Sequence, residues 1–186
     1  QNGSTYYYYD ANGELHKSWL NTENGYYYLN LSTGKMTVGW EKINNKWYYF
    51  QGNGVMATGW VKDNGKYYYM LTDGTMHTGW VSIDGVYYYL GDSGAMATGW
   101  VNMDNGWYYF DPNDGKCTVN SAREIKDSWY MFGSDGKMVT GWQQVDGGYY
   151  YFHTDGRMLT GWLSDGTNSY YMDPANGRMS TGWKQI

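Results

Sequence analysis

The apolar and polar positions of this chain follow a pattern that returns at a fixed interval. Each unit begins with Gly-Trp and continues through a polar stretch, three aromatic residues, an apolar residue, a turn with glycine, and a methionine often followed by threonine. Such a period is typical of a repeat architecture rather than of one globular core. The Gly-Trp pairs are Gly39-Trp40, Gly59-Trp60, Gly79-Trp80, Gly99-Trp100, Gly141-Trp142, Gly161-Trp162 and Gly182-Trp183.

Two short runs of strand-forming residues occupy the first half of each unit, as in Trp40–Ile43 and Trp47–Phe50. Asn or Asp, usually with Gly, stands between the two runs, and these residues tolerate the positive φ of a tight turn. Each unit therefore predicts a β-hairpin. The predicted turn pairs are Asn44-Asn45, Asn64-Gly65, Asp84-Gly85, Asn105-Gly106 and Asp146-Gly147.

The predicted architecture is an all-β solenoid of stacked hairpins, because a single two-stranded hairpin is marginal in water. The sequence predicts about eight hairpins in one domain covering residues 1–186. A partial unit at the start carries Tyr6 to Tyr9, and the last pair, Gly182-Trp183, opens a hairpin that the chain does not complete.

Some units depart from the pattern. Ala122 stands where a Trp is expected, Ser169 replaces the first aromatic of its unit, and Cys117 takes a methionine position. The repeat at about 116–140 is therefore atypical, and we expect Lys116–Ser128 to bend the solenoid or to contact another module.

Alternation along a strand places Trp47 on one face and Tyr48 on the other. If Trp40 and Trp47 face the gap before the next hairpin, the middle Tyr of that hairpin, Tyr68, faces back into the same gap. The three rings would form three walls, and Met56 in the connection would add a fourth, apolar contact.

Aromatic walls of this kind attract a quaternary ammonium, with about 0.5–2 kcal/mol from each face. A single site would be weak, on the order of millimolar, so repetition supplies avidity. Two other interpretations stay open: sugar rings stack on flat aromatics, and some of these rings are simply core. The core interpretation is preferred for the third aromatic of each run, at Tyr49, Tyr69 and Tyr89.

Composition and charge narrow the function. Aromatic residues make up 20% of the chain, which argues against disorder. A net charge of −5 argues against nucleic acid, and no apolar stretch is long enough to span a membrane. With Cys117 alone, no disulfide forms within the chain. The sequence opens inside a repeat without a signal peptide, so we expect it to be a piece of a longer, secreted protein.

Catalytic and metal chemistry find no support in the sequence. The three histidines are interpreted as lying at different repeat positions, without the spacing of metal ligands: His16, His77 and His153. His77 is interpreted as a solvated surface residue. The acidic residues gather in turns, where they favour the turn itself. We predict a non-catalytic binding module without cofactor or metal.

The motif GW-x(6)-WYYF-x(3)-G-x-M-x-T at Gly39 to Thr58 resembles the choline-binding repeats of streptococcal surface proteins and cell-wall hydrolases. The resemblance covers nearly the whole chain. It implies a left-handed superhelix, choline as ligand, and non-covalent attachment to phosphocholine on teichoic and lipoteichoic acids at the bacterial cell surface. Host proteins are possible further partners.

In this family two aromatics of one repeat and a Tyr of the next hold choline, often with a Met. The implied sets are Trp19, Tyr26 and Tyr48; Trp40, Trp47, Tyr68 and Met56; Trp60, Tyr67, Tyr88 and Met76; Trp80, Tyr87, Tyr108 and Met96; Trp100, Trp107 and Tyr130; and Trp142, Tyr149, Tyr170 and Met158.

Two junctions lack a wall, and we expect them to bind choline poorly. At the first junction Ala122 replaces a wall, so only Trp129 and Tyr150 remain. At the second, Ser169 replaces a wall, so Trp162 remains alone. Two other functions stay open for the module as a whole: carbohydrate binding, as in related glucan-binding and clostridial toxin repeats, and a structural or protein-interaction spacer.

Overall fold

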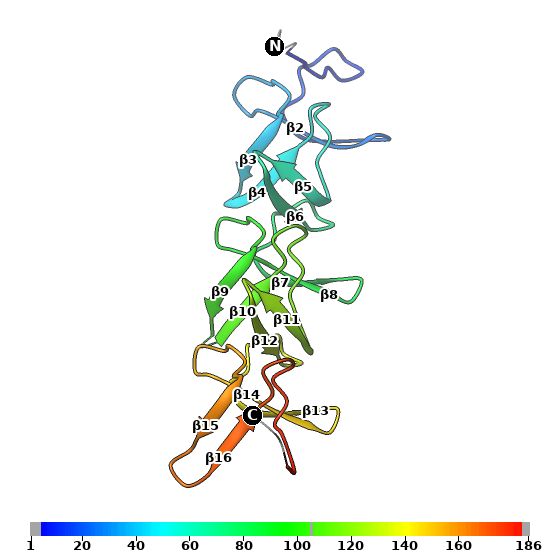
Figure 1. The fold of residues 1–186 in the computed structure, drawn as a ribbon. Coiled ribbons are helices and arrows are strands. Elements are labelled where there is room, and N and C mark those ends of the chain that lie inside the picture. The colour runs from blue at the N-terminus through cyan, green and yellow to red at the C-terminus, as the bar shows by residue number, and fades with distance from the viewer. Residues whose placement is uncertain (1–4, 105, 184–186) are drawn as a thin grey trace. The chain divides into compact units, whose positions relative to one another are not determined.

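The computed structural model describes residues 5–104 and 106–183, and these residues form short antiparallel hairpins joined by loops (Figure 1). Each strand pairs with its neighbour in sequence, giving eight two-stranded sheets in the described part of the chain. The predicted all-β series of hairpins is confirmed. The strands are β1 (Ser18–Thr22), β2 (Gly25–Leu29), β3 (Gly39–Ile43), β4 (Lys46–Phe50), β5 (Gly59–Asp63), β6 (Lys66–Met70), β7 (Gly79–Ile83), β8 (Val86–Leu90), β9 (Gly99–Met103), β10 (Gly106–Phe110), β11 (Ser121–Ile125), β12 (Ser128–Phe132), β13 (Gly141–Val145), β14 (Gly148–Phe152), β15 (Gly161–Ser164) and β16 (Ser169–Met172).

The hairpin turns use the left-handed backbone that their sequence predicts. Asn44 and Asn45 have φ values of 49° and 66°, and Asn64 has a φ of 46°. One turn was placed wrongly, because Gly106 is the first residue of β10 and pairs with Met103. Asp104, with a φ of 51°, begins that turn, and Asn105 lies outside the described residues.

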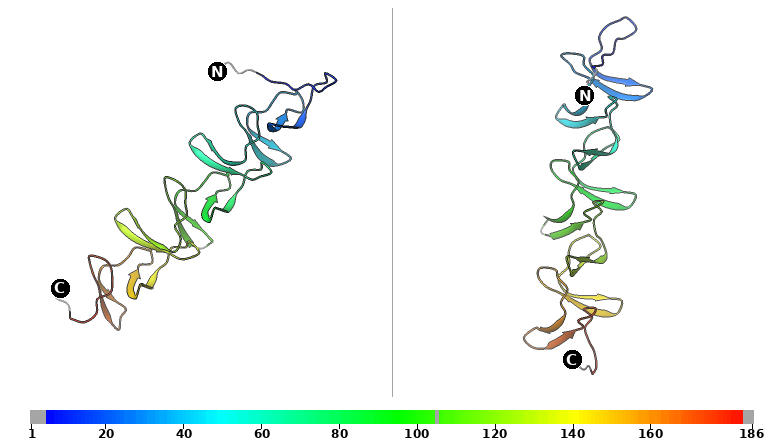
Figure 2. Two further views of the ribbon diagram at one scale, coloured as in Figure 1. Left: turned by 90° about the vertical axis from the view of Figure 1, so that its right-hand side faces the viewer. Right: turned by 45° about the horizontal axis from the view of Figure 1, so that its top comes forward.

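The chain divides into two compact parts, each made of several repeats. From here on, the first unit means the described parts of 1–83 with 89–97, and the second unit those of 84–88 with 98–186. In both views of Figure 2 the hairpins alternate with long loops, and each loop carries the methionine position of its repeat. That the whole chain is one domain stays a prediction.

Backbone hydrogen bonds tie each loop to the preceding hairpin. In the first unit the Met76 N–H donates to the Trp47 carbonyl at 2.8 Å, and the next N–H, of His77, donates to Tyr69 of its own hairpin at 2.8 Å. The same bond to the preceding hairpin recurs along both units. Among its other pairs are Met36 to Tyr6, Met56 to Tyr26, Met96 to Tyr67, Cys117 to Tyr87, Met138 to Trp107, Met158 to Trp129 and Met179 to Tyr149.

The core repeats with the hairpins. The last residue of each second strand is buried, as Phe50 and Leu90 are at 0% exposure. Tyr49 is half-buried and packs edge-on against Trp40 at 5.1 Å between ring centroids, which agrees with its assignment to the core. In the first junction, Tyr28, Ile43 and Phe50 form one buried cluster.

The atypical repeat forms an ordinary hairpin, β11 with β12. The Arg123 guanidinium pairs with the Asp111 carboxylate and lies 5.1 Å from the Tyr109 ring centroid. These contacts hold β11 against the preceding repeat. The bend or module contact expected for Lys116–Ser128 stays a prediction.

Candidate aromatic cages between hairpins

The clearest cage in the first unit lies between the hairpin β3–β4 and the next one. Trp40 and Trp47 meet edge-on at 6.4 Å between centroids, and Tyr68 meets Trp40 at 4.7 Å. Trp40 pairs across the hairpin with Tyr49, and Lys42 with Trp47, so both indoles project to one face. The three rings line a cavity of about 340 Å³ with Met76 and Ser93.

The middle Tyr of the following hairpin therefore reaches the position that strand alternation predicts. Trp47 is 42% exposed, so its ring is open to a ligand. Trp40 is half-buried and packs against the cluster of Ala57, Val61 and Met70. One indole is thus anchored by the core, while the other forms an accessible wall.

The methionine assignment from the sequence was wrong by one repeat. Met76, not Met56, lines the cavity of Trp40 and Trp47, because its N–H is bonded to the Trp47 carbonyl. By the same bond Met96 belongs with Tyr67, and Met158 with Trp129 rather than with Trp142. Each methionine therefore comes from the repeat that supplies the middle Tyr.

In three further sets, each within one unit, the middle Tyr of one hairpin meets the first-strand Trp of the hairpin before it. Tyr48 lies 5.0 Å from Trp19, Tyr130 lies 4.9 Å from Trp100, and Tyr170 lies 4.9 Å from Trp142. Trp107 stands edge-on to Trp100 at 6.3 Å. The backbone bonds complete these sets with Met56 at Tyr26, Met138 at Trp107 and Met179 at Tyr149.

Two predicted sets draw on both units, and as complete cages they stay predictions. In the first unit, Trp60 meets Tyr67 edge-on at 6.4 Å, and Tyr88 belongs to the other unit. Trp80 belongs to the first unit, whereas Tyr87 and Tyr108 belong to the second.

Charged side chains stand beside some of these walls. The Trp40 indole N–H donates to the Asp63 carboxylate at 3.2 Å, which fixes the ring. Lys42 Nζ lies 5.8 Å from the Trp47 ring centroid, and Lys62 Nζ lies 5.0 Å from that of Tyr67. These sites are therefore not electrostatically identical.

The phenols of Tyr48 and Tyr108 are neutral at physiological pH. Burial raises the pKa of Tyr48, and the Asp73 carboxylate raises it further. Burial also raises the pKa of Tyr108, with Asp135 and Asp104 adding to the effect. Attraction of a cation by these rings therefore comes from their π faces and not from a phenolate charge.

Asp63, Lys42 and Ser93 were missed by the sequence reasoning. The sequence did contain a signal for Asp63: it is a charged residue at a repeat position that is mostly apolar, as Ile43 and Ile83 show. The sequence contained no signal for Ser93, since this residue reaches the cavity from a loop two repeats further along the chain.

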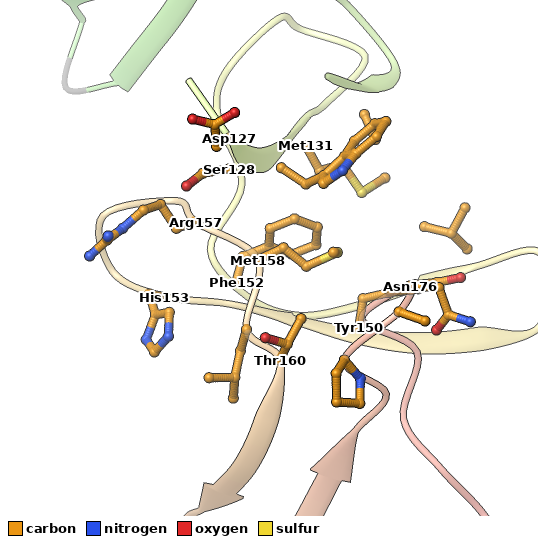
Figure 3. A pocket seen from close by; sticks show the side chains of 16 residues that line it. Asp127, Ser128, Met131, Tyr150, Phe152, His153, Arg157, Met158, Thr160 and Asn176 are labelled. Atoms are coloured by element: carbon orange, nitrogen blue, oxygen red, sulfur yellow. The ribbon is translucent and has the colours of Figure 1, made fainter. Parts of the chain in front are cut away.

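The junction at Ala122 lies within the second unit and lacks the first indole. Trp129 and Tyr150 remain, together with Met158, and they border a larger cavity of about 850 Å³. Figure 3 shows Met131, Phe152 and Met158 grouped there, with Tyr150 and Asn176 to one side. Asn176 occupies the repeat position of Ser93. The missing wall thus leaves an open space and not a collapsed one.

At Ser169 the first aromatic is replaced by a small residue that pairs with Ser164. Trp162 packs edge-on against Tyr171 at 5.1 Å and is 62% exposed. That this junction binds choline poorly stays a prediction.

The histidines and the cysteine do not form a reactive site. His16 and His77 share one repeat position, contrary to the sequence interpretation: each bonds through Nε2 to the carbonyl three residues on, at 2.9 and 3.0 Å. His77 is accordingly half-buried and not simply solvated. Burial raises the pKa of the Cys117 thiol to about 11, so it stays protonated at neutral pH.

Residues 5–104 and 106–183 contain no cluster of three His, Cys, Asp or Glu side chains that could hold a metal ion. Over the same part of the chain, no helix has the length and apolar character needed to cross a membrane.

Solved structures of pneumococcal proteins resemble this chain closely. CbpJ from Streptococcus pneumoniae is 30% identical, with a TM-score of 0.86 over 97% of this chain and 72% of that one. Choline-binding protein F of the same organism is 28% identical, with a TM-score of 0.81 over 95% of this chain and 70% of its own. The choline-binding domain of CbpL is 27% identical, with a TM-score of 0.65 over 89% and 87%.

Family models give the same result. A model described as a choline-binding repeat matches residues 37–78, 77–121 and 139–183, and a cell wall binding repeat model matches 123–138. A comparison with curated proteins gave no match. The repeated cages, the hairpin series and these matches together show that the chain belongs to the choline-binding repeat family of cell-wall-binding modules.

Proposed function

We propose that the chain holds its parent protein on the bacterial cell wall by seating choline groups of teichoic and lipoteichoic acids in the cages between hairpins. One observation carries the proposal: Trp40, Trp47, Tyr68 and Met76 surround a single open cavity. Family membership supports the choice of choline as the ligand.

The cage suits a trimethylated nitrogen for a physical reason. Such a cation offers no N–H to a hydrogen-bond acceptor, and the aromatic faces attract it without one. Each site is expected to be weak, because few side chains touch the ligand and its immobilisation has a cost. Several sites on one chain can engage several cholines of one polymer, so the polymer is held much more tightly than free choline.

We propose that this module is non-catalytic and acts outside the cell. The chain consists of choline-binding repeats, with no catalytic domain evident. A similar structure, the modular autolysin LytC of Streptococcus pneumoniae, matches 94% of this chain but only 42% of its own length, at 27% identity. Such a ratio fits a binding module attached to other domains.

Carbohydrate binding is a second candidate, supported by one comparison. Choline-binding protein F was solved in the presence of a peptidoglycan analogue, a tetrasaccharide-pentapeptide. Elution separates the two candidates. Free choline is expected to release this chain from a trimethylammonium resin, whereas a glucan or a peptidoglycan fragment is not.

Isothermal calorimetry with choline tests the proposal. Trp47→Ala removes an exposed wall, and the affinity of that site is expected to fall roughly two- to thirtyfold. Trp162→Ala, an exposed Trp at a junction without a complete set of walls, is the matched control and is expected to change little. A folded wild-type chain that shows no saturable heat with choline would overturn the proposal.

A further inference from the structure

On the second strand of a hairpin such as β3–β4, the first aromatic residue is a cage wall, and we call it the first cage aromatic. The residue paired with it on the first strand differs in charge from one repeat to the next. In the first unit Lys42 pairs with Trp47, and Lys62 with Tyr67. Since directly paired residues project to the same face of a hairpin, this side chain stands beside the cage wall. The corresponding pairs elsewhere are Asn21 with Tyr26, Asn102 with Trp107, Glu124 with Trp129, and Gln144 with Tyr149.

The two lysines lie against the rings that a choline would contact. Lys42 Nζ is 5.8 Å from the Trp47 centroid, and Lys62 Nζ is 5.0 Å from the Tyr67 centroid. Both lysines are exposed. A free choline entering either site brings a second positive charge to the same ring, and the two charges repel each other.

Phosphocholine differs from choline by a phosphate on the choline oxygen, two carbons away from the quaternary nitrogen. With the nitrogen in the cage, the phosphate lies just outside the walls, where a neighbouring ammonium attracts it. We propose that the residue paired with the first cage aromatic sets the preference between the two ligands. Lys42 and Lys62 select phosphocholine over choline, Asn102 leaves the preference small, and Glu124 disfavours the phosphate. This inference rests on the proposed function.

Other charges near these sites act as well. Asp63 accepts the Trp40 indole N–H, and its negative charge opposes Lys42 by favouring the ammonium and disfavouring the phosphate. Hydrogen bonds from Thr75 lower the pKa of the Asp73 carboxyl, and the charge of Lys46, at the start of β4, lowers it further. At the Asn102 site, Ile125 takes the place of Asp63, and Lys137 Nζ donates to the Asp104 carbonyl at 3.4 Å. A test must therefore exchange the paired residue alone.

Among the residues that the structure describes, two sites have the same four wall types. One consists of Trp40, Trp47, Tyr68 and Met76, and the other of Trp100, Trp107, Tyr130 and Met138. Their indole pairs lie 6.4 and 6.3 Å apart, and their Trp–Tyr pairs 4.7 and 4.9 Å apart. Because the walls agree so closely, Lys42 against Asn102 is a natural comparison.

NMR titration of the indole N–H signals of Trp47 and Trp107 reads the two sites separately. Each is titrated with choline and with phosphocholine at pH 7.5, where the phosphate is largely doubly charged. The ratio of the choline Kd to the phosphocholine Kd is expected to be about two- to fivefold larger at Trp47, the size of an exposed charge pair. Added salt should shrink that difference by screening.

Reciprocal variants locate the cause. Lys42→Asn is expected to lower the Trp47 ratio to that of Trp107, and Asn102→Lys to raise the Trp107 ratio. Asp63→Asn should raise the Trp47 ratio further. If both sites bind choline with equal ratios that neither Lys42→Asn nor Asn102→Lys changes, the inference is overturned and the proposed function stands. If neither indole responds to either ligand in the folded chain, the proposed function fails and this inference with it.

Discussion

At the scale of single residues, the repeat depends on turn positions that only glycine can occupy. Gly74 has a φ of +81°, and a Cβ there would lie 2.1 Å from Sδ of Met56. The same relation joins Gly54 to Met36 and Gly156 to Met138. The turn glycine of one repeat therefore leaves space for the methionine of the repeat before it, which in turn lies beside a cage.

Gly74→Ala is predicted to destabilise the chain more than Gly59→Ala. Both glycines have positive φ, but a Cβ at Gly59 would meet nothing within 4 Å. Gly59→Ala should cost about 1–2 kcal/mol for the left-handed backbone, and Gly74→Ala about 1–3 kcal/mol more for the clash with Met56. Urea unfolding measures both values. Equal losses would show that the methionine is free to move away.

At the scale of the hairpin, the two faces of one hairpin contribute to two different junctions. The face that carries Trp40 and Trp47 looks toward the following hairpin, whereas the opposite face carries Tyr48 and Phe50. One strand pair thus supplies two walls to the cage after it and one wall to the cage before it. A change in one hairpin therefore affects two neighbouring cages in different ways.

Ala122→Trp is predicted to create an additional choline site. The cavity at Ala122 has a volume of about 850 Å³ and keeps Trp129, Tyr150 and Met158 as walls. The new indole supplies the missing π face, so calorimetry is expected to count one more bound choline per chain. Ala122→Leu fills space without a π face and is the matched control. A similar gain with both variants would attribute the effect to packing alone.

At the scale of the whole molecule, the cages are distributed over both units. The sets at Trp19 and Trp40 lie in the first, and those at Trp100 and Trp142 in the second. In a repeat protein, stability is approximately a sum of the repeats and their nearest-neighbour interfaces. A ligand that bridges two hairpins therefore strengthens the interface terms.

Choline is predicted to raise the melting temperature in proportion to the number of occupied cages. At ten times its Kd, a ligand that binds only the folded state adds about 1.4 kcal/mol per site. Differential scanning calorimetry with choline, and with ethanolamine at equal ionic strength as control, measures the effect. An equal shift with the primary amine would mean that the trimethylated nitrogen is not recognised.

Much of the fold could be predicted from the sequence because its signals are local. Alternation set the faces of Trp47 and Tyr48, and Asn44-Asn45 fixed a turn. The middle Tyr of the four sets that lie within one unit followed from the same alternation. The turn at Asp104 was misplaced by one residue, because Asp104-Asn105 and Asn105-Gly106 are both acceptable turn pairs.

The sequence by itself thus determined the hairpin, the period of the repeat, and which Trp and middle Tyr meet at the gaps that begin with Trp19, Trp40, Trp100 and Trp142. Only the tertiary structure decided which methionine closes which cage, that Asp63 holds Trp40, and that Ser93 reaches in from two repeats away. The physical reason is range: strand alternation acts between adjacent residues, whereas these contacts depend on how one repeat is bonded to the next.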